Sequence, residues 1–238
     1  MLINDYIKDI SSCCNLNMLL GSSGLVMFTW GNVSILSEDR KYVFIKPSGV
    51  PFMDLLDEHI SIVDVESGDH IAGLKPSVDT PIHLSLYRSD SSLQSICHNH
   101  SHFATVWAQT AQDLPLIGTT HADYFPEKIP NIPIADITSI KHYEESIGLA
   151  VSNYLQGINH DAAELGAVLL QSHGPLVFSG KSDDIIEKAM VLEEVASLAF
   201  HTNLLIGNLC SKININADRL FKFHYNRKHG NERYYGQS

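Results

Sequence analysis

The sequence predicts an α/β fold in which a central, mostly antiparallel sheet is covered by helices. Short strand-like apolar runs gather in the middle of the 238-residue chain, and segments of helical periodicity precede, separate and follow them. Successive strand-like runs are joined by short, hairpin-type connections, which favours antiparallel pairing. No repeat, low-complexity tract or linker interrupts this pattern, so we expect residues 1–238 to form a single domain.

The helices are predicted from apolar residues at a spacing of three or four and from residues that favour a first turn. Pro81 and Ser182 mark two such starts, and Asp183 and Asp184 add the negative charge that a helix N-terminus prefers. The expected helices cover about residues 2–20, 80–88, 103–109, 143–155, 182–206 and 218–229.

The strands are predicted from short runs of apolar and β-branched residues bounded by turn residues. They are expected at residues 29–36, 42–45, 60–65, 93–97, 114–118, 167–171 and 176–178. Residues 119–125 and the proline-rich segment 126–133 are expected to be loops.

Composition narrows the class of protein. The net charge of -11 with neutral histidines disfavours a nucleic-acid-binding surface. No apolar run has the ~18 residues that a membrane span needs, so no membrane association is expected. The four cysteines lack a Cys-x-x-Cys pair, and we interpret them as reduced thiols of a cytoplasmic protein.

Two histidines separated by one residue follow the strand-like run 93–97. In an extended chain His98 and His100 would point to the same face, as in many metal sites. His173, which follows another buried-looking strand, is the best third ligand, although solvent-exposed or core histidines are the alternative. Three neutral histidines leave an open coordination position, which is typical of a catalytic metal.

Several residues near predicted turns could bind an anion. Lys46, Ser48 and Gly49 offer a cation, a hydroxyl and an accessible backbone amide, which are the parts of a phosphate site. Asn32 adds an amide, and Ser77 lies at a predicted helix start. Each of them is more often part of an ordinary turn. Asp79 precedes the same helix, where the local sequence favours an N-cap role.

Two other stretches combine polar and aromatic residues. The segment 119–124 contains His121, Asp123 and Tyr124, a composition suited to proton transfer but common in loops. The tail is unusually aromatic, with Tyr235 near its end, so it is expected to pack on something, a neighbouring subunit being one choice. Signatures of serine hydrolases, zinc peptidases and nucleotide-binding loops are absent.

Taken together, these stretches resemble the class II aldolase/adducin family, and within it the pentulose-phosphate 4-epimerases. The resemblance follows the chain in order over nearly its whole length. It is carried by residues 29–34, 45–50, 77–81, 98–101, 118–125, 172–175, 191–196, 227–230 and 234–237.

The resemblance implies a cyclic homotetramer with active sites between subunits. It also implies a zinc ion, replaceable by manganese or cobalt, on His98, His100 and His173, with Asp79 as a further ligand. The implied acid/base pair is Asp123 with Tyr235 from a neighbouring subunit. The implied substrate and phosphate contacts are Asn32, Lys46, Ser48, Gly49, Ser77, Thr119 and His224.

The implied reaction is metal-dependent inversion at C4 of L-ribulose 5-phosphate to D-xylulose 5-phosphate, by retro-aldol cleavage and re-addition. The alternatives are a sugar-phosphate aldolase of the same family that releases its products, and a non-catalytic adducin-like interaction protein. Asp79, where the aldolases carry glutamate, favours the epimerase, as does the 119–124 segment. Intact histidines argue against the interaction protein.

The chain departs from the epimerase pattern in three places. Val78 stands where a second serine is usual, which removes one hydrogen bond to phosphate. Asn99 replaces a threonine between the two histidines, where its side chain is expected to point away from them. Residues 126–140 diverge, so the loop near the substrate is expected to differ.

Overall fold

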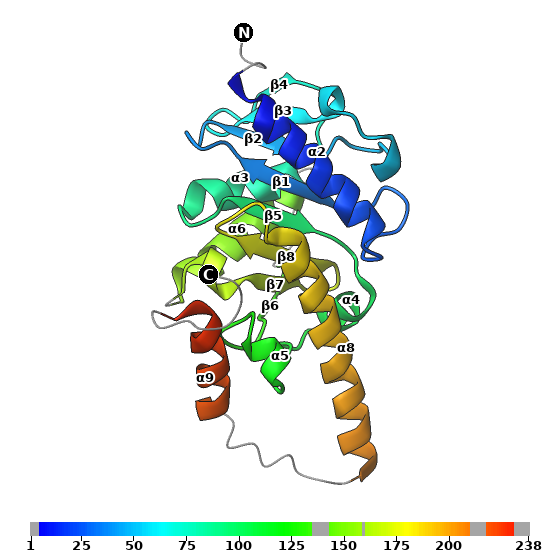
Figure 1. The fold of residues 1–238 in the computed structure, drawn as a ribbon, viewed down its shortest axis with the longest axis vertical. Helices are drawn as coiled ribbons and strands as arrows, with labels where there is room; N and C mark the ends of the chain where they lie inside the picture. Colours follow the sequence, from blue (N-terminus) through cyan, green and yellow to red (C-terminus); the bar gives the residue numbers. More distant parts are fainter. Residues whose placement is uncertain (1–4, 135–142, 159, 210–217, 231–238) are drawn as a thin grey trace.

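A computed structural model describes residues 5–134, 143–158, 160–209 and 218–230, and one eight-stranded sheet runs through them (Figure 1). The strand order is β4-β3-β2-β1-β5-β8-β7-β6. All neighbouring strands are antiparallel except β6 and β7, which confirms the predicted mostly antiparallel sheet. The strands are β1 Asn32–Leu36, β2 Tyr42–Ile45, β3 Ser61–Asp64, β4 His70–Ala72, β5 Ser95–His98, β6 Asn131–Ile132, β7 Ala167–Leu170 and β8 Gly174–Ser179.

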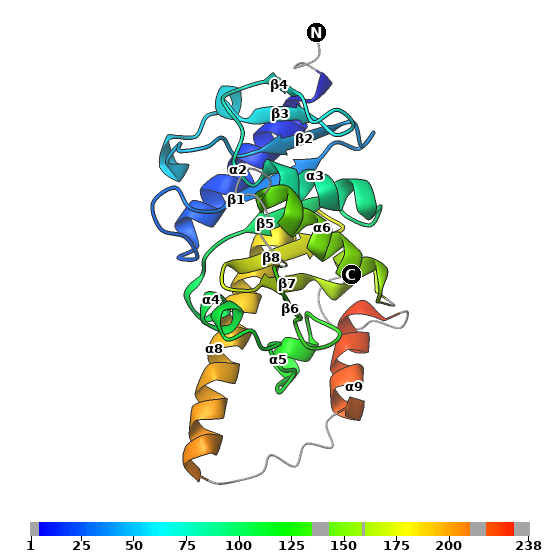
Figure 2. The same cartoon turned by 180° about the vertical axis from the view of Figure 1, so that it is seen from behind.

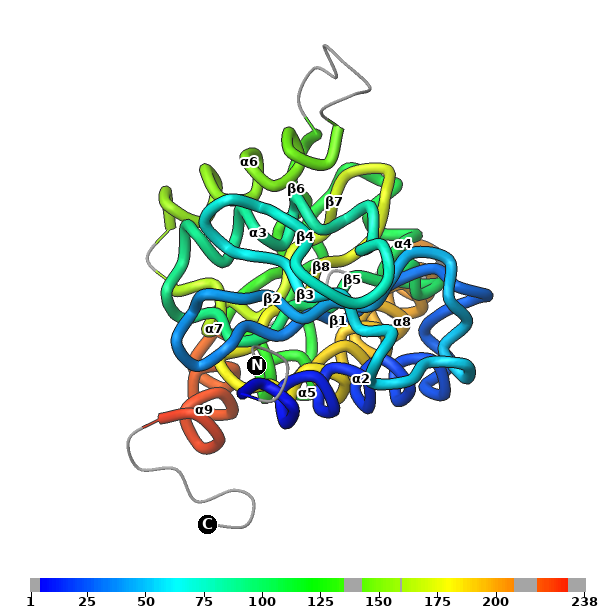
Figure 3. Tube along the Cα trace, turned by 90° about the horizontal axis from the view of Figure 1, so that it is seen from above, coloured from blue at the N-terminus to red at the C-terminus, as the bar shows by residue number. Residues whose placement is uncertain are grey.

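Helices cover both faces of the sheet. Viewed from above, α3 and α6 lie on one side of the strands and α2 and α8 lie on the other (Figure 3). Figure 2 shows the face of the sheet that α3 and α6 cover. The helices are α2 Ile7–Ser22, α3 Thr80–Ser89, α4 His102–Gln109, α5 Thr119–Ala122, α6 Tyr143–Gln156, α7 Ala162–Leu165, α8 Ile185–Leu209 and α9 Asp218–His229, with short 3-10 turns at Phe52–Asp54 and Asp57–His59.

The alternation of side chains along the strands divides the core in two. Val33 and Ile35 of β1 pack with α2, α4 and α8, whereas Leu36 packs on the opposite face with α3 and α6. In β7, Leu169 joins the first cluster and Leu170 the second. Both faces of the sheet are therefore apolar. For this reason the strand sequences are nearly continuous apolar runs and do not alternate between apolar and polar residues.

The predicted elements differ from the observed ones where local signals are weak. Residues 114–118 do not form the expected strand, since only Leu114 makes an isolated bridge, to Ile129. Part of the expected loop at 119–125 is the one-turn helix α5, and β6 lies within the expected loop at 126–133. Strands of two or three residues such as β6 and β4 take their stability from the neighbouring strand, which their own sequence does not reveal.

Helix α8 is the described helix that bears on whether a segment could cross a membrane, although charged residues such as Lys188 and Glu193 interrupt its apolar residues. Between Ile185 and Gly207 it is long and apolar enough to do so by length and composition, with a mean hydropathy of 1.3. A core helix passes the same test, and Leu192, Val195 and Ala196 of α8 are buried in the first core cluster.

Candidate active site

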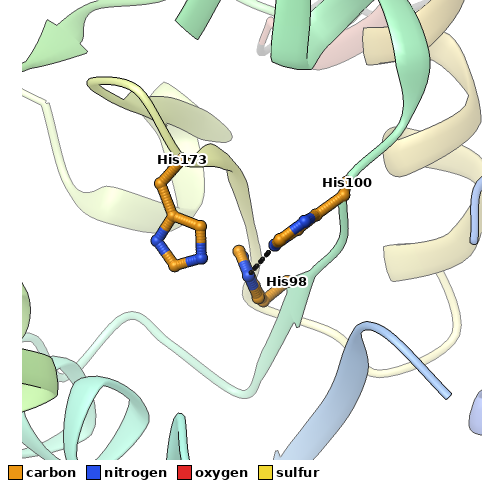
Figure 4. A group of neighbouring side chains, drawn as sticks. All are labelled: His98, His100 and His173. Carbon is orange, nitrogen blue, oxygen red and sulfur yellow. Dashed lines mark hydrogen bonds between the residues drawn. The ribbon is translucent and has the colours of Figure 1, made fainter. Parts of the chain in front are cut away.

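Strand β5 delivers the first two histidines. His98 is its last residue and pairs with Asn32 of β1 and Leu176 of β8. His100 lies two residues beyond the end of the strand, whereas the predicted strand ended one residue earlier, at residue 97. Its imidazole nevertheless meets that of His98, with 3.1 Å between the two Nε2 atoms and 5.0 Å between the ring centroids (Figure 4).

Asn99, between the histidines, is buried and shapes this turn. Its Oδ1 accepts a hydrogen bond of 2.9 Å from the backbone N–H of Ser101. The side chain therefore fastens the loop that carries His100, which the sequence analysis did not anticipate for a residue expected only to point away.

The third histidine comes from the turn between β7 and β8. The His173 ring centroid lies 4.7 Å from that of His98 and 5.0 Å from that of His100. Gly174 permits this approach, because a Cβ there would lie 2.7 Å from the Asn99 carbonyl oxygen. One nitrogen from each of the three rings lies within 4.8 Å of the others, the arrangement needed to hold a metal ion.

The donor set suits a divalent metal. His98 Nδ1 lies 3.0 Å from the Pro175 carbonyl oxygen, so its N–H donates there and the Nε2 lone pair faces the cluster. His173 Nδ1 is buried and has no hydrogen-bond partner among the described residues. Burial, aided by His98 and His100, lowers the pKa of His173 to about 4, and burial also lowers the pKa of His100. Both are therefore neutral at pH 7, as a metal ligand must be.

Asp79 lies at the N-cap position of α3, but its side chain does not cap the helix. Its Oδ2 accepts hydrogen bonds from Asn32 Nδ2 at 2.7 Å and from Ser77 Oγ at 3.3 Å. Burial raises the pKa of this carboxyl, but the nearby His98 and His83 and the bond from Asn32 outweigh it, so the pKa is lowered. An ionised carboxylate thus stands beside the histidines, and its role as a metal ligand stays a prediction.

The histidines and the predicted phosphate residues line one cavity of about 270 Å³. It brings together turns that are far apart in the sequence. The lining residues are Thr29, Trp30, Gly31, Asn32, Lys46, Pro47, Ser48, Gly49, Ser77, Val78, Asp79, His98, His100 and His173.

Lys46 gives this cavity an anion-binding character. Its side chain is buried, and Nζ has only the carbonyl oxygens of Pro47 at 3.3 Å and Thr29 at 3.4 Å as hydrogen-bond acceptors among the described residues. Burial lowers its pKa to about 8, so it is still mostly charged at pH 7. Lys46 is therefore a buried cation with no carboxylate partner among the residues that the structure describes. Such a cation is strongly attracted to a phosphate.

Five residues that line the cavity were not predicted as site residues: Thr29, Trp30, Gly31, Pro47 and Val78. Trp30 is half exposed, and its ring centroid lies 6.3 Å from that of His100. Gly31 has a φ of +92°, and a Cβ there would lie 2.8 Å from the His98 carbonyl oxygen, so only glycine lets β1 pass this close. Trp30 and Gly31 belong to the segment 29–34 that carries the family resemblance. From this segment, only Asn32 was predicted as a site residue.

Asp123, Thr119 and His224 form a second group, at α5 and α9, and none of them lines the cavity. Asp123 Oδ1 is 3.0 Å from His224 Nδ1, and Oδ2 accepts a bond of 3.0 Å from Arg227 Nη2. Arg227 Nε also donates to Oδ1 at 3.3 Å. The chain therefore separates the predicted acid/base residue from the histidine cluster. Tyr235 lies outside the described residues.

Comparison with known proteins identifies the family of this chain. Residues 11–200 match the model of the Class II Aldolase and Adducin N-terminal domain, and the chain belongs to this family. It is 37% identical to the probable L-ribulose-5-phosphate 4-epimerase UlaF of Mycoplasma pneumoniae, over 99% of this chain and 96% of that one. It is 36% identical to L-ribulose-5-phosphate 4-epimerase UlaF of Salmonella paratyphi C, over 93% and 95%. The expectation of an epimerase-like enzyme is thereby confirmed.

Solved structures share the fold. An L-fuculose 1-phosphate aldolase superposes with a TM-score of 0.71 at 20% identity, covering 92% of this chain and 95% of that one. YgbL of Escherichia coli, a putative aldolase/epimerase/decarboxylase, gives a TM-score of 0.68 at 21% identity, covering 90% and 97%. The predicted fold class is confirmed.

Proposed function

We propose that this protein inverts C4 of L-ribulose 5-phosphate to give D-xylulose 5-phosphate, by retro-aldol cleavage and re-addition. One observation carries the proposal: the histidine cluster and Lys46, a cation with no carboxylate partner among the described residues, line the same cavity. A sugar phosphate has two ends that match these two groups. Its oxygen-rich carbon chain can bind a metal held by the histidines, and its phosphate dianion can pair with Lys46. The names of the two full-length relatives support this choice of substrate.

The residues divide the work of binding. Lys46, Ser48 and the Gly49 amide hold the phosphate end, and Ser77 adds a hydroxyl at the start of α3. Asn32 donates to both Ser77 and Asp79, so it keeps these two side chains in place. A divalent ion on His98, His100 and His173, zinc with manganese or cobalt as substitutes, would supply Lewis-acid stabilisation of the negative charge that develops on the ketose oxygens.

Proton transfer needs groups on both faces of C4. We assign this proton transfer to Asp123 and Tyr235 in a homotetramer, both of them supplied to the cavity by a neighbouring subunit. Asp123 does not line the cavity of its own chain. His224 and Arg227 orient the Asp123 carboxylate.

Cys13, Cys14 and Cys97 are buried free thiols, which supports a reducing, cytoplasmic location.

The test is an assay on L-ribulose 5-phosphate with added zinc, in which D-xylulose 5-phosphate is followed and any free aldehyde is trapped. Inverted ketose without released aldehyde is expected. Free dihydroxyacetone and glycolaldehyde phosphate would instead identify an aldolase. Absence of both bound zinc and turnover would leave the adducin-like interaction protein.

His98→Asn tests the histidine site directly. We expect loss of bound zinc and a fall in kcat of at least about 10²-fold, because the variant lacks one of three ligands. Zinc is measured by atomic absorption after gel filtration. His102→Asn is the matched control, since His102 is exposed and lies outside the cluster. Normal zinc content in His98→Asn would refute the ligand assignment.

A further inference from the structure

Helix α4, which begins two residues after His100, has no cap of its own. Ser101 occupies the N-cap position, but its side chain makes no capping hydrogen bond. Its Oγ is buried without a partner among the described residues. The first N–H groups of a helix have no acceptor within the helix, so they need one from elsewhere.

Glu193, from the middle of α8, supplies that acceptor. Its Oε1 accepts a bond of 2.8 Å from the Phe103 N–H, and its Oε2 one of 3.0 Å from the Ala104 N–H. These are the two N–H groups that a capping side chain usually satisfies. The carboxylate also places a negative charge at the positive end of α4, and bonds to a charged acceptor are the strong ones.

Two side chains consequently fix the short stretch between His98 and α4. The bond from the Ser101 N–H to Asn99 Oδ1 closes a turn around His100, and Glu193 holds the first turn of the helix directly after it. The position of His100 relative to His98 is therefore set by side chains that do not line the cavity.

The rest of α4 is attached to α8 without Glu193. Trp107 Nε1 donates a bond of 3.0 Å to the Ala196 carbonyl oxygen. The Phe103 and Phe200 rings pack with their centroids 5.6 Å apart. Loss of the Glu193 carboxylate should therefore loosen the first turn of α4 while the helix stays docked.

We propose that Glu193 is a positioning residue for the histidine site. By holding the first turn of α4 it keeps His100 where its imidazole and that of His98 can bind the same divalent cation. The inference rests on the metal site of the proposed function, and it assigns to α8 a role in that site that its place in the core does not suggest.

Glu193→Gln is the test, because it keeps the size of the side chain, removes the charge and turns an amide NH₂ toward one backbone N–H. We expect zinc to bind about tenfold more weakly, the low end of what loss of an outer-sphere partner costs. The visible absorption of the Co²⁺-loaded protein should shift, because it reports coordination geometry. The metal-free variant should still unfold in one transition. Glu194→Gln, at the exposed neighbouring glutamate, should change none of these readings.

The outcomes separate the possible failures. Wild-type zinc affinity and an unchanged cobalt spectrum in Glu193→Gln would overturn the role of Glu193 alone. Failure of the unaltered protein to bind zinc would refute the proposed function as well. If Glu193→Gln does not fold, Glu193→Asp replaces it, since it keeps the charge but shortens the reach. Weaker zinc binding by folded Glu193→Asp would then support the inference, and unchanged binding would overturn it.

Discussion

Val78 lines the cavity next to Ser77, and the residue is 60% exposed. An isopropyl group there offers no hydrogen bond at the position where the family resemblance implies a second serine. On the proposed function, the phosphate would then be held by Lys46, Ser48 and Ser77 with one donor fewer.

Val78→Ser should consequently improve substrate binding. We expect KM for L-ribulose 5-phosphate to fall about three- to tenfold with kcat unchanged, the effect of one hydrogen bond worth about 1 kcal/mol. Steady-state kinetics measure it. Val78→Ala is the control, because it removes the methyl groups without adding a hydroxyl. Equal KM values for the serine and alanine variants would make the departure from the family pattern neutral.

At the scale of elements, α3 joins the site to the sheet. Its N-terminus places Asp79 at the cavity, and one turn later the wholly buried His83 bonds to β1 through Ser34 Oγ at 2.7 Å. Ser34 in turn bonds to Tyr87 of α3 at 2.8 Å. Burial lowers the pKa of His83 to about 3, so the folded protein holds this imidazole neutral.

This burial makes stability depend on pH. Below about pH 6.5 the unfolded chain protonates His83, but the folded chain does so only near pH 3, so stability falls as pH falls through that window. One proton corresponds to a slope of up to about 1.4 kcal/mol per pH unit. The free energy of unfolding of the metal-free protein can be measured by urea unfolding between pH 7.5 and 5. Its slope against pH should be smaller in His83→Gln than in the unaltered protein, by up to this amount.

His102→Gln serves as the comparison for His83→Gln, because His102 is exposed. The slope of His83→Gln should be the smaller of the two. The lower absolute stability expected for His83→Gln, which loses the bond to Ser34, does not affect the comparison of slopes. Identical slopes in all three proteins would show that His83 titrates alike in the folded and unfolded chains.

At the scale of the whole molecule, the two groups of candidate functional residues occupy different places. The histidines lie where β5 and β8 meet, whereas Asp123 is held by Arg227 at the junction of α5 and α9. Neither Asp123 nor Thr119 lines the cavity. If both groups act on one substrate, each site must combine residues of two subunits.

Mixing two inactive variants tests this arrangement. His98→Asn and Asp123→Asn subunits, unfolded and refolded together, should form hybrids in which some sites have both groups intact. Random assembly predicts recovery of about a quarter of wild-type activity, because each site draws each group from one of two equally frequent subunits. Native mass spectrometry verifies the hybrids. Hybrids without activity would place all catalytic groups in a single chain.

The sequence by itself determined the longer elements and the chemistry of the site. Apolar periodicity predicted α6, α9 and β2 closely, because spacing and propensity over several residues are local properties. Residue type alone predicted three imidazoles for a metal and Lys46 for an anion. The family resemblance linked these stretches to one site, although they lie far apart in the chain.

Only the tertiary structure decided how these parts meet. The end of β5 at His98, the short strand β6, and the bond between Glu193 and α4 depend on partners tens of residues away in the chain. The orientation of Asp79 toward Asn32, rather than over its own helix, is likewise set by a contact from β1. The energies of such contacts come from packing and burial, which local sequence does not encode.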